Sequence, residues 1–319
     1  MPNAAVPCAV IGSYNHDLLF RTPTLPGPGE TCLGSATPAH GGKGFNQSVA
    51  AVRLGVSTHF VGAVGDDVFA ADVGEFAAAE GIEAHWLVVA DTPTGLASVT
   101  VDDAGANQIV VASGANAHLD AGTVLQVLDA IGDAVVVCQL EVPPATSAAA
   151  LEWAHNRGQP GILDPAPVVA DFTLEQLRLA RIITPNEHEF GDLARRFLGL
   201  NVADDLAHAD DQVLHQWCRR LGVDTVVLTI GKSGCFVSHD DESSLRPASP
   251  FYRVPGIPVA PIDTTGAGDC FTGALAAALI HRPDDFPRAC RFANRAASIA
   301  VTRSGAAPAM PRLAELAEH

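Results

Sequence analysis

Apolar and polar positions along the chain predict a regular succession of strands and helices. The N-terminal part predicts strands at 5–12 and 59–64 and helices at 44–54 and 67–80. From residue 120 the pattern predicts strands at 134–140, 161–164, 182–184 and 225–229, a short strand pair to about 254, and helices at 120–131, 144–157, 186–198, 205–221, 268–281 and 285–302. The strands are continuous apolar runs without alternation, which is typical of a parallel sheet that helices cover on both faces.

Two segments do not follow this rhythm. The segments near 18–40 and 84–112 each contain strand-like runs and no helix signal, and the first is rich in Pro and Gly over 22–29. We expect them to form a small β-sheet lid projecting from the main domain. The sequence thus predicts one α/β domain over 1–319, three-layered (α/β/α) with a mostly parallel central sheet, and a β lid from about 18–40 and 84–112.

Composition excludes several classes of protein. Hydrophobic residues make up 48% of the chain, which is enough for a large core and excludes global disorder. The net charge of −17 argues against a nucleic-acid or anionic-membrane partner, although backbone amides can still bind phosphate locally. Seven cysteines without a C-x-x-C pair indicate a reducing compartment. The longest apolar uncharged run, 270–280, falls short of the ~20 residues that span a bilayer, so we expect a soluble, cytoplasmic protein.

The strongest local signal is the run DTTGAGD at 263–269, which leads directly into an apolar helix. Glycines at a helix start let a ligand approach the backbone, and the first-turn amides lack intrahelical partners, so an anion can bind there. Asp269 lies in this first turn and is equally consistent with an acidic residue that complements the helix dipole. The surplus of glycine and the second acidic residue, Asp263, favour a binding site.

Polar residues follow other predicted strands. Asn15 and Asp17 come after the first strand, and Glu141 ends another. At the carboxyl end of parallel strands such residues are more often functional than structural, and a carboxylate can hold two vicinal hydroxyls. The run GGKGFNQ at 41–47 is either a Gly-rich turn before a helix or part of a polyol site to which Lys43 and Asn46 contribute donors.

Other patterns are weaker. Asn186 and Glu189 begin a helix, where Asn186 reads as an N-cap or as a residue that orients a metal–phosphate group. The P-loop pattern fails at both Gly-Lys pairs, because position 226 is Val and no Ser or Thr follows Lys43. No strand–G-x-G-x-x-G–helix unit is present, so the dinucleotide fingerprint is missing.

Taken together, these motifs resemble the ribokinase branch of the PfkB carbohydrate kinase family, in the same order and over almost the whole chain. The matching runs are GSYNHD at 12–17, PGET at 28–31, GGKGFNQ at 41–47, GAN at 114–116, QLE at 139–141, PAP at 165–167, TPNE at 184–187, DTTGAGD at 263–269 and the closing loop at 300–306. The resemblance implies a ribokinase-like fold and ATP-dependent phosphorylation of the 5-hydroxyl of D-ribose. It also implies a homodimer formed through the lids.

The resemblance further implies roles for individual residues. Asp269 would be the base, and the anion hole for the γ-phosphoryl group would be formed by Gly266, Ala267 and Gly268. The sugar would be held by Asn15, Asp17, Gly42, Lys43, Asn46, Glu141 and Asp269. The nucleotide site would be lined by Asn186, Thr229, Gly231, Gly234, Gly268 and Asn294. Glu189 would act on Mg²⁺ through water, and an activating K⁺ would be bound by Asp263 with carbonyls of Thr265, Ala300, Arg303 and Gly305.

This sequence departs from the family pattern at a few positions. Tyr14, His16, His40 and Phe45 are larger or more polar than usual and are expected to crowd or polarise the sugar end. Ala309 stands where a Ser often helps to bind the cation, so one K⁺ ligand is expected to be missing. The alternatives are a kinase of another sugar, such as 2-deoxyribose, another pentose or a hexose, a nucleoside kinase, and a non-catalytic sugar sensor on the same fold.

Overall fold

The computed structural model describes residues 6–202 and 205–317. In these residues the larger sheet has nine strands in the order β13-β12-β11-β10-β9-β8-β1-β4-β5. Neighbouring strands from β5 to β11 pair in parallel. Strand β12 is antiparallel to both of its neighbours, β11 and β13. The strands are β1 (Cys8–Ile11), β4 (Thr58–Gly65), β5 (Glu83–Val89), β8 (Val135–Cys138), β9 (Gly161–Leu163), β10 (Ile182–Ile183), β11 (Thr225–Thr229), β12 (Gly234–His239) and β13 (Phe251–Pro255).

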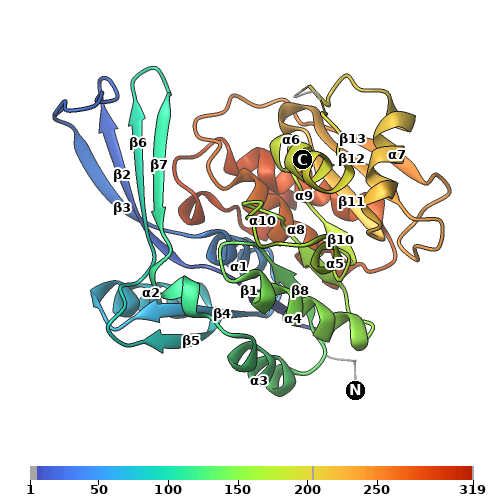
Figure 1. Cartoon of the computed structure of the whole chain (residues 1–319), viewed down its shortest axis with the longest axis horizontal. Helices are drawn as coiled ribbons and strands as arrows, with labels where there is room; N and C mark the ends of the chain where they lie inside the picture. Colours follow the sequence, from blue (N-terminus) through green and yellow to red (C-terminus); the bar gives the residue numbers. More distant parts are fainter. Residues whose placement is uncertain (1–5, 203–204, 318–319) are drawn as a thin grey trace.

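Helices cover both faces of this sheet (Figure 1). One face carries α1 (Lys43–Arg53), α2 (Val68–Glu80), α8 (Ala267–His281) and α9 (Phe286–Ala300), and the other carries α3 (Ala121–Ile131), α4 (Pro144–Asn156), α5 (Leu174–Leu177), α6 (Glu187–Leu193) and α7 (Asp211–Leu221). In β1, Cys8 and Val10 belong to the first core and Ala9 and Ile11 to the second. Side chains of a strand alternate between its faces, so a strand buried on both sides must be apolar throughout. The predicted three-layer architecture is confirmed.

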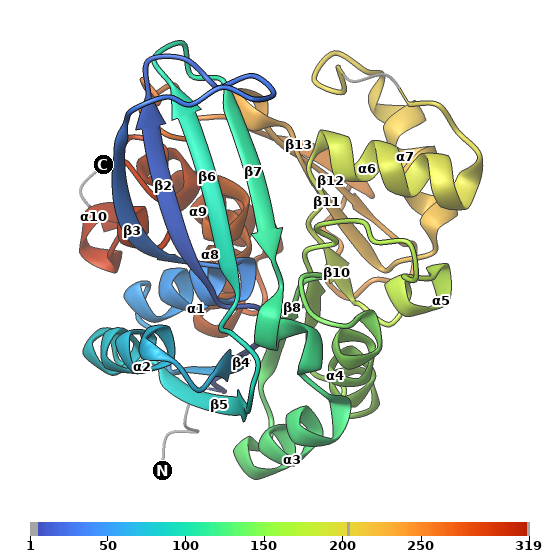
Figure 2. The same ribbon diagram turned by 60° about the vertical axis from the view of Figure 1, so that its left-hand side comes forward.

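A second sheet stands beside the main body (Figures 1 and 2). Its order is β3-β2-β6-β7, from β2 (Asn15–Thr22), β3 (Ser35–Gly41), β6 (Leu96–Asp102) and β7 (Asn107–Ala112). We call this sheet the lid. The pairs β2–β3 and β6–β7 are antiparallel, whereas β2 and β6 are parallel.

The prediction that 84–89 belongs to the lid is wrong. This segment is β5, the edge strand of the large sheet, where it pairs in parallel with β4. Ala84 and Trp86 pack against one core of the main body, and Leu87 and Val89 pack against the other. Burial on both faces therefore holds β5 in the large sheet, and the lid is built from 15–41 and 96–112.

Several boundaries differ from the predicted ones. The helix expected at 205–221 begins at Asp211, because the side chain of Asp210 caps it by accepting the amides of Gln212 and Val213. The helix expected at 186–198 is α6 followed by a π turn over Ala194–Leu198. A last short helix, α10 (Leu313–Ala317), follows the two long C-terminal helices. Among the described residues, every helix is too short or too polar to cross a bilayer.

Candidate active site

The start of α8 is the structural counterpart of the DTTGAGD run. Gly266 caps the helix with φ of +72°, a left-handed conformation that favours glycine, and an added Cβ would lie 3.1 Å from the Cβ of Ala306. The amide of Ala267 donates to the carbonyl of Thr264 at 3.2 Å. A Cβ added to Gly268 would meet open space among the described residues. The helix start is therefore accessible, and its positive dipole end is available to an anion.

Asp269 lies in the first turn of α8 and is 5% exposed. Its Oδ2 accepts a hydrogen bond from Nδ2 of Asn46 at 2.9 Å, and its Oδ1 accepts one from Nε2 of Gln47 at 3.2 Å. Both donors come from α1, which packs so closely that a Cβ on Gly273 would lie 2.4 Å from the carbonyl oxygen of Gln47. The contact between α1 and α8 therefore brings the predicted base and the GGKGFNQ run into one site.

One ammonium group is surrounded by carboxylates in this site. Nζ of Lys43 lies 3.7 Å from Oδ2 of Asp164 and 4.0 Å from Oδ1 of Asp269. Burial disfavours the charged ammonium, but attraction to Asp164, Asp269, Glu189 and Glu141 outweighs it and raises the pKa of Lys43. Burial and the excess of negative charge raise the pKa values of Asp164 and Glu189, although Lys43 opposes this. These carboxylates outnumber the one ammonium of Lys43, and carboxylate oxygens are the ligands that Mg²⁺ prefers. The residues present could therefore hold Mg²⁺.

Asp164 was missed by the sequence analysis. It follows β9, is 3% exposed, and accepts a hydrogen bond from Nε2 of Gln47 at 2.9 Å. Gln47 in turn accepts from Nε2 of Gln139 at 2.6 Å, so the amides form a chain behind the site. An acid at the carboxyl end of a buried parallel strand was the available signal, the same one that selected Asp17 and Glu141.

The predicted sugar residues gather where the lid meets the main body. Asn15 and Asp17 lie two residues apart on β2, so their side chains leave the same face of the strand. Gly42 has φ of +87°, and an added Cβ would lie 2.7 Å from the backbone nitrogen of Asn15, so this close approach requires glycine. Burial, reinforced by the negative charges of Glu141 and Asp269, raises the pKa of Asp17 to about 7. Oδ1 of Asn46 is buried and has no hydrogen-bond partner among the described residues, so an acceptor is available for a ligand hydroxyl.

Two further residues hold this region in place. Ser13 donates its hydroxyl to Oε2 of Glu141 at 2.5 Å, and the amide of Lys43 donates to the same oxygen at 3.0 Å. Asn116 donates its side-chain amide to Oδ1 of Asn15 at 2.9 Å. A cavity of about 380 Å³ is lined by Asn15, Asn116 and Glu141 together with apolar residues.

A more apolar groove of about 540 Å³ lies beside the start of α8 and extends along α9. Its lining includes Gly231, Lys232, Ile257, Val259, Ala267 and Asn294. Nδ2 of Asn294 donates to the carbonyl of Pro255 at 2.7 Å, which ties the groove loop to α9. The apolar lining suits a heterocycle such as a nucleotide base.

Other residues expected around the nucleotide do not line this groove. They make contacts within the protein instead. Asn186 and Glu189 form a capping box at the start of α6, with bonds of 2.9 and 2.7 Å between each side chain and the other's amide. Thr229 ends β11 and forms an isolated bridge with Asn186. A Cβ on Gly234 would lie 2.1 Å from the carbonyl oxygen of Val254, so this glycine permits close strand pairing.

The predicted cation residues lie on two neighbouring loops. Asp263 accepts amide hydrogen bonds from Thr265 and Gly305, both at 2.9 Å, and these bonds lower its pKa although partial burial opposes this. Ala300 ends α9, and the guanidinium of Arg303 pairs with Glu315. Two amides use about half of the lone-pair capacity of the Asp263 carboxylate, so acceptor capacity remains that a cation could use.

Two of the unusual side chains do not crowd the sugar end. Tyr14 and Phe45 are 0% exposed and belong to the main core. Their rings pack edge to face at 5.3 Å, and Phe45 also contacts Phe60 at 5.4 Å. The expectation that they narrow the sugar region is wrong, because both rings are used for core packing. The rings of His16 and His40 instead pack against aromatic side chains of α2.

This chain is similar to known proteins over nearly its whole length. The family model described as pfkB family carbohydrate kinase matches residues 7–313. A ribokinase from Haemophilus influenzae is 37% identical over 315 residues, covering 97% of this chain and 96% of that protein. A mouse ribokinase is 34% identical, covering 96% of this chain and 92% of that protein. Among solved structures, a ribokinase from Arabidopsis thaliana in complex with ribose and ATP has a TM-score of 0.83 at 30% identity, covering 99% of this chain and 100% of that one.

Proposed function

The chain belongs to the pfkB family of carbohydrate kinases, and from this premise we propose that it transfers the γ-phosphoryl group of ATP to the 5-hydroxyl of D-ribose. The observation that carries the proposal is the position of Asp269. This buried carboxylate lies at an accessible helix start and is bonded to Asn46 of the GGKGFNQ run. A sugar hydroxyl and a phosphate can therefore meet at one place.

In this proposal Asp269 accepts the hydroxyl proton as the oxygen attacks phosphorus. Phosphoryl transfer needs alignment and charge stabilisation more than covalent help. The amides of Gly266, Ala267 and Gly268 stabilise the transferring group at the positive end of α8, and the ammonium of Lys43 lies within 4.0 Å of the base. The ribose is held by Asn15, Asp17, Gly42, Lys43, Asn46 and Glu141.

The nucleotide base occupies the groove beside α9, between Gly231 and Asn294. We assign Asn186, Thr229 and Gly234 to the outer boundary of the same site, where they shape the backbone that ATP contacts. Mg²⁺ bound near Glu189 would neutralise phosphate charge, and K⁺ bound at Asp263, with carbonyls of Thr265, Ala300, Arg303 and Gly305, would support the loop before α8. Asp263 contributes to this loop directly through its two amide hydrogen bonds.

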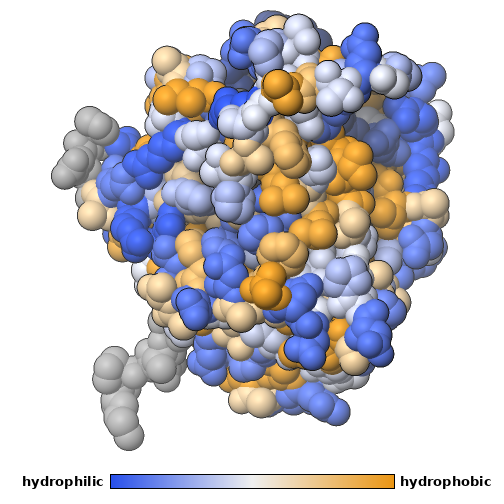
Figure 3. Space-filling view, turned by 90° about the vertical axis from the view of Figure 1, so that its left-hand side faces the viewer, coloured by the Kyte–Doolittle hydropathy of each residue, from blue (hydrophilic) through white to orange (hydrophobic). Residues whose placement is uncertain are grey.

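The exposed apolar surface of the lid supports the proposal that the protein is a homodimer. Its strand β7 is exposed along its whole length, and Ile109, Val110 and Val111 are 54, 70 and 46% exposed. Figure 3, which views the molecule from the lid side, shows apolar side chains spread across this face. Apolar strand surfaces of this kind are typical of protein interfaces, so we propose that two lids pack together. All seven cysteines are free, which supports a reducing compartment, and we propose the cytoplasm.

A substrate panel tests the proposed function. ADP release is measured with ATP·Mg²⁺ and, separately, ribose, 2-deoxyribose, arabinose, xylose, fructose, adenosine and inosine. We expect the highest kcat/KM with ribose and a product phosphorylated at the 5-position by NMR. A higher kcat/KM with another acceptor would contradict the substrate assignment, and no acceptor-dependent ADP release would contradict the kinase activity itself.

A further inference from the structure

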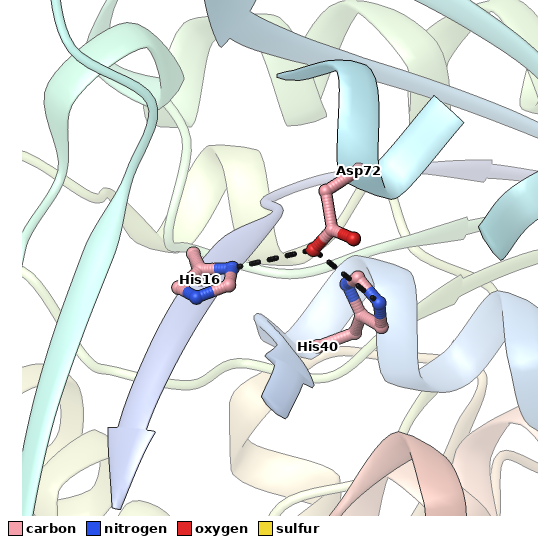
Figure 4. Close-up of side chains that lie close together, drawn as sticks. All are labelled: His16, His40 and Asp72. Atoms are coloured by element: carbon pink, nitrogen blue, oxygen red, sulfur yellow. Dashed lines mark ion pairs between the residues drawn. The ribbon is translucent and has the colours of Figure 1, made fainter. Parts of the chain in front are cut away.

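Two histidines and an aspartate meet at the base of the lid, outside the proposed catalytic residues. His16 on β2 and His40 on β3 are cross-strand partners, and Asp72 lies on α2. Figure 4 shows the three side chains pointing at one another from these three elements. Oδ2 of Asp72 is 3.8 Å from Nδ1 of His16 and 3.8 Å from Nε2 of His40. All three ligand atoms lie within 4.8 Å of one another.

Helix α2 holds both imidazole rings in place. Phe69, Asp72 and Phe76 have the spacing of one helix face. The ring of Phe69 lies 4.3 Å from that of His16, and the ring of Phe76 lies 4.3 Å from that of His40. The carboxylate is therefore placed between two rings that aromatic contacts keep in position, and little side-chain entropy remains to be lost on binding an ion.

The hydrogen bonds leave the inward-facing nitrogen atoms available. Nδ1 of His40 lies 3.0 Å from the hydroxyl of Tyr14, so its Nε2 faces Asp72. His16 is 6% exposed, and its Nδ1 has no hydrogen-bond partner among the described residues. A buried nitrogen without a partner is costly in a folded protein.

We propose that His16 Nδ1, His40 Nε2 and Asp72 Oδ2 bind a divalent first-row transition ion such as Zn²⁺. Zinc holds such ligands at about 2.0–2.2 Å, which places tetrahedral ligand atoms about 3.4 Å apart. The two 3.8 Å separations from Asp72 Oδ2 would close by about 0.4 Å, and the two ring nitrogen atoms, which lie within 4.8 Å of each other, would also have to approach. The side chain of Asp72 is 54% exposed and can move by that amount, and its exposure leaves a fourth position for water. Two imidazole ligands select against Mg²⁺, which prefers an all-oxygen shell.

The ion would join the root of the lid to the main body. His16 lies between Asn15 and Asp17 on β2, and His40 is followed by the glycine turn that leads into α1. A bond from both strands to α2 would restrain the lid relative to the large sheet. Since the ion binds the folded chain, it should also raise the melting temperature.

Isothermal titration with Zn²⁺, on chelator-treated protein without ATP or sugar, tests the proposal. His59, Glu83 and His85 form a second group of ligand atoms, so the titrations use a His85→Gln background. With Mg²⁺ in excess to occupy the carboxylates around Lys43, we expect one Zn²⁺ per chain with micromolar or tighter affinity, and a visible Co²⁺ spectrum of tetrahedral intensity. Asp72→Asn and His40→Gln should each weaken binding at least tenfold.

Glu75→Gln is the matched control, because it removes the same charge from an exposed position on the same helix. It should leave the affinity unchanged, and the same Zn²⁺ concentration should raise the melting temperature of this control more than that of Asp72→Asn. Asp72 is exposed, so its variant is expected to fold even if His40→Gln does not. No binding in the background protein, or equal affinity in Asp72→Asn and Glu75→Gln, would overturn the proposal.

Discussion

Replacing Asp269 by asparagine removes the proposed base with almost no change in size. Both carboxylate oxygens accept hydrogen bonds from side-chain amides, one from Asn46 and one from Gln47. In the variant one of these oxygens becomes an NH₂ group that faces a donor, and a buried donor left unpaired costs roughly 1–3 kcal/mol. Rotation of the Asn46 amide relieves this, since its Oδ1 has no partner among the described residues and can accept from the new NH₂.

The stability of the variant should therefore stay close to that of the wild type, and the loss should fall on catalysis. Loss of a general base typically costs about 10²–10⁴-fold, which corresponds to about 3–5 kcal/mol of transition-state stabilisation. The rotated Asn46 amide would present NH₂ instead of oxygen to the sugar, so we also expect a higher KM for ribose. The KM for ATP should change little, because the groove beside α9 is not altered.

The assay is single-turnover phosphoryl transfer with ATP·Mg²⁺ and saturating ribose, with melting temperature and circular dichroism measured on the same samples. Asp284→Asn, which makes the same chemical change at an exposed turn, is the control and should behave as the wild type. A folded Asp269→Asn protein with a wild-type rate constant would refute the role of Asp269. A loss of rate that accompanies a large fall in melting temperature would instead refute the amide-rotation argument.

Three further predictions concern pH, the cation and assembly. Because the folded chain raises the pKa of Asp17 to about 7, above its unfolded value of about 3.9, the folded state binds the extra proton and stability falls as pH rises from 4 to 7. Melting curves should show that Asp17→Asn gains stability over the wild type above pH 7 but not at pH 4, while its KM for ribose rises; a pH-independent difference would contradict this. K⁺ titrated against choline at constant ionic strength should activate the enzyme more than Na⁺, with a lower half-saturating concentration in Ala309→Ser and little activation in Asp263→Ala; a flat wild-type response would mean that no cation acts there. Val110 is 70% exposed on the lid, so light scattering should give a dimer for the wild type and a monomer for Val110→Lys, and a wild-type species of 33.0 kDa with full activity would contradict the lid interface.

The position of His16 links the lid to the sugar residues. It separates Asn15 from Asp17 on β2, so both proposed sugar residues share a short stretch of backbone with a proposed metal ligand. Binding of a transition ion at this position would restrain that stretch without contacting substrate. Zinc titration and ribose kinetics on the same Asp72→Asn protein would therefore report separately on the metal site and on the sugar site.

Much of the fold could be predicted from local patterns. The buried strands and the Asp residues that cap helices act through neighbours in the sequence, so their signals are local. The pattern of 84–89 predicts a strand but not the sheet to which it belongs, because a short strand has the same pattern at the edge of either sheet. Its place depends on the two cores that Trp86 and Leu87 contact, and those contacts form only after the chain has folded.

The layered architecture, the order of the motifs and the chemical types of the candidate residues follow from periodicity and motif spacing, which are properties of the chain alone. Tertiary packing decides which groups meet. It brought Asp164 to Lys43, turned Tyr14 and Phe45 into the core, and placed Asp72 between His16 and His40. Contacts of this kind join residues far apart in the sequence, and they follow from how α1, α2 and α8 pack on the sheets.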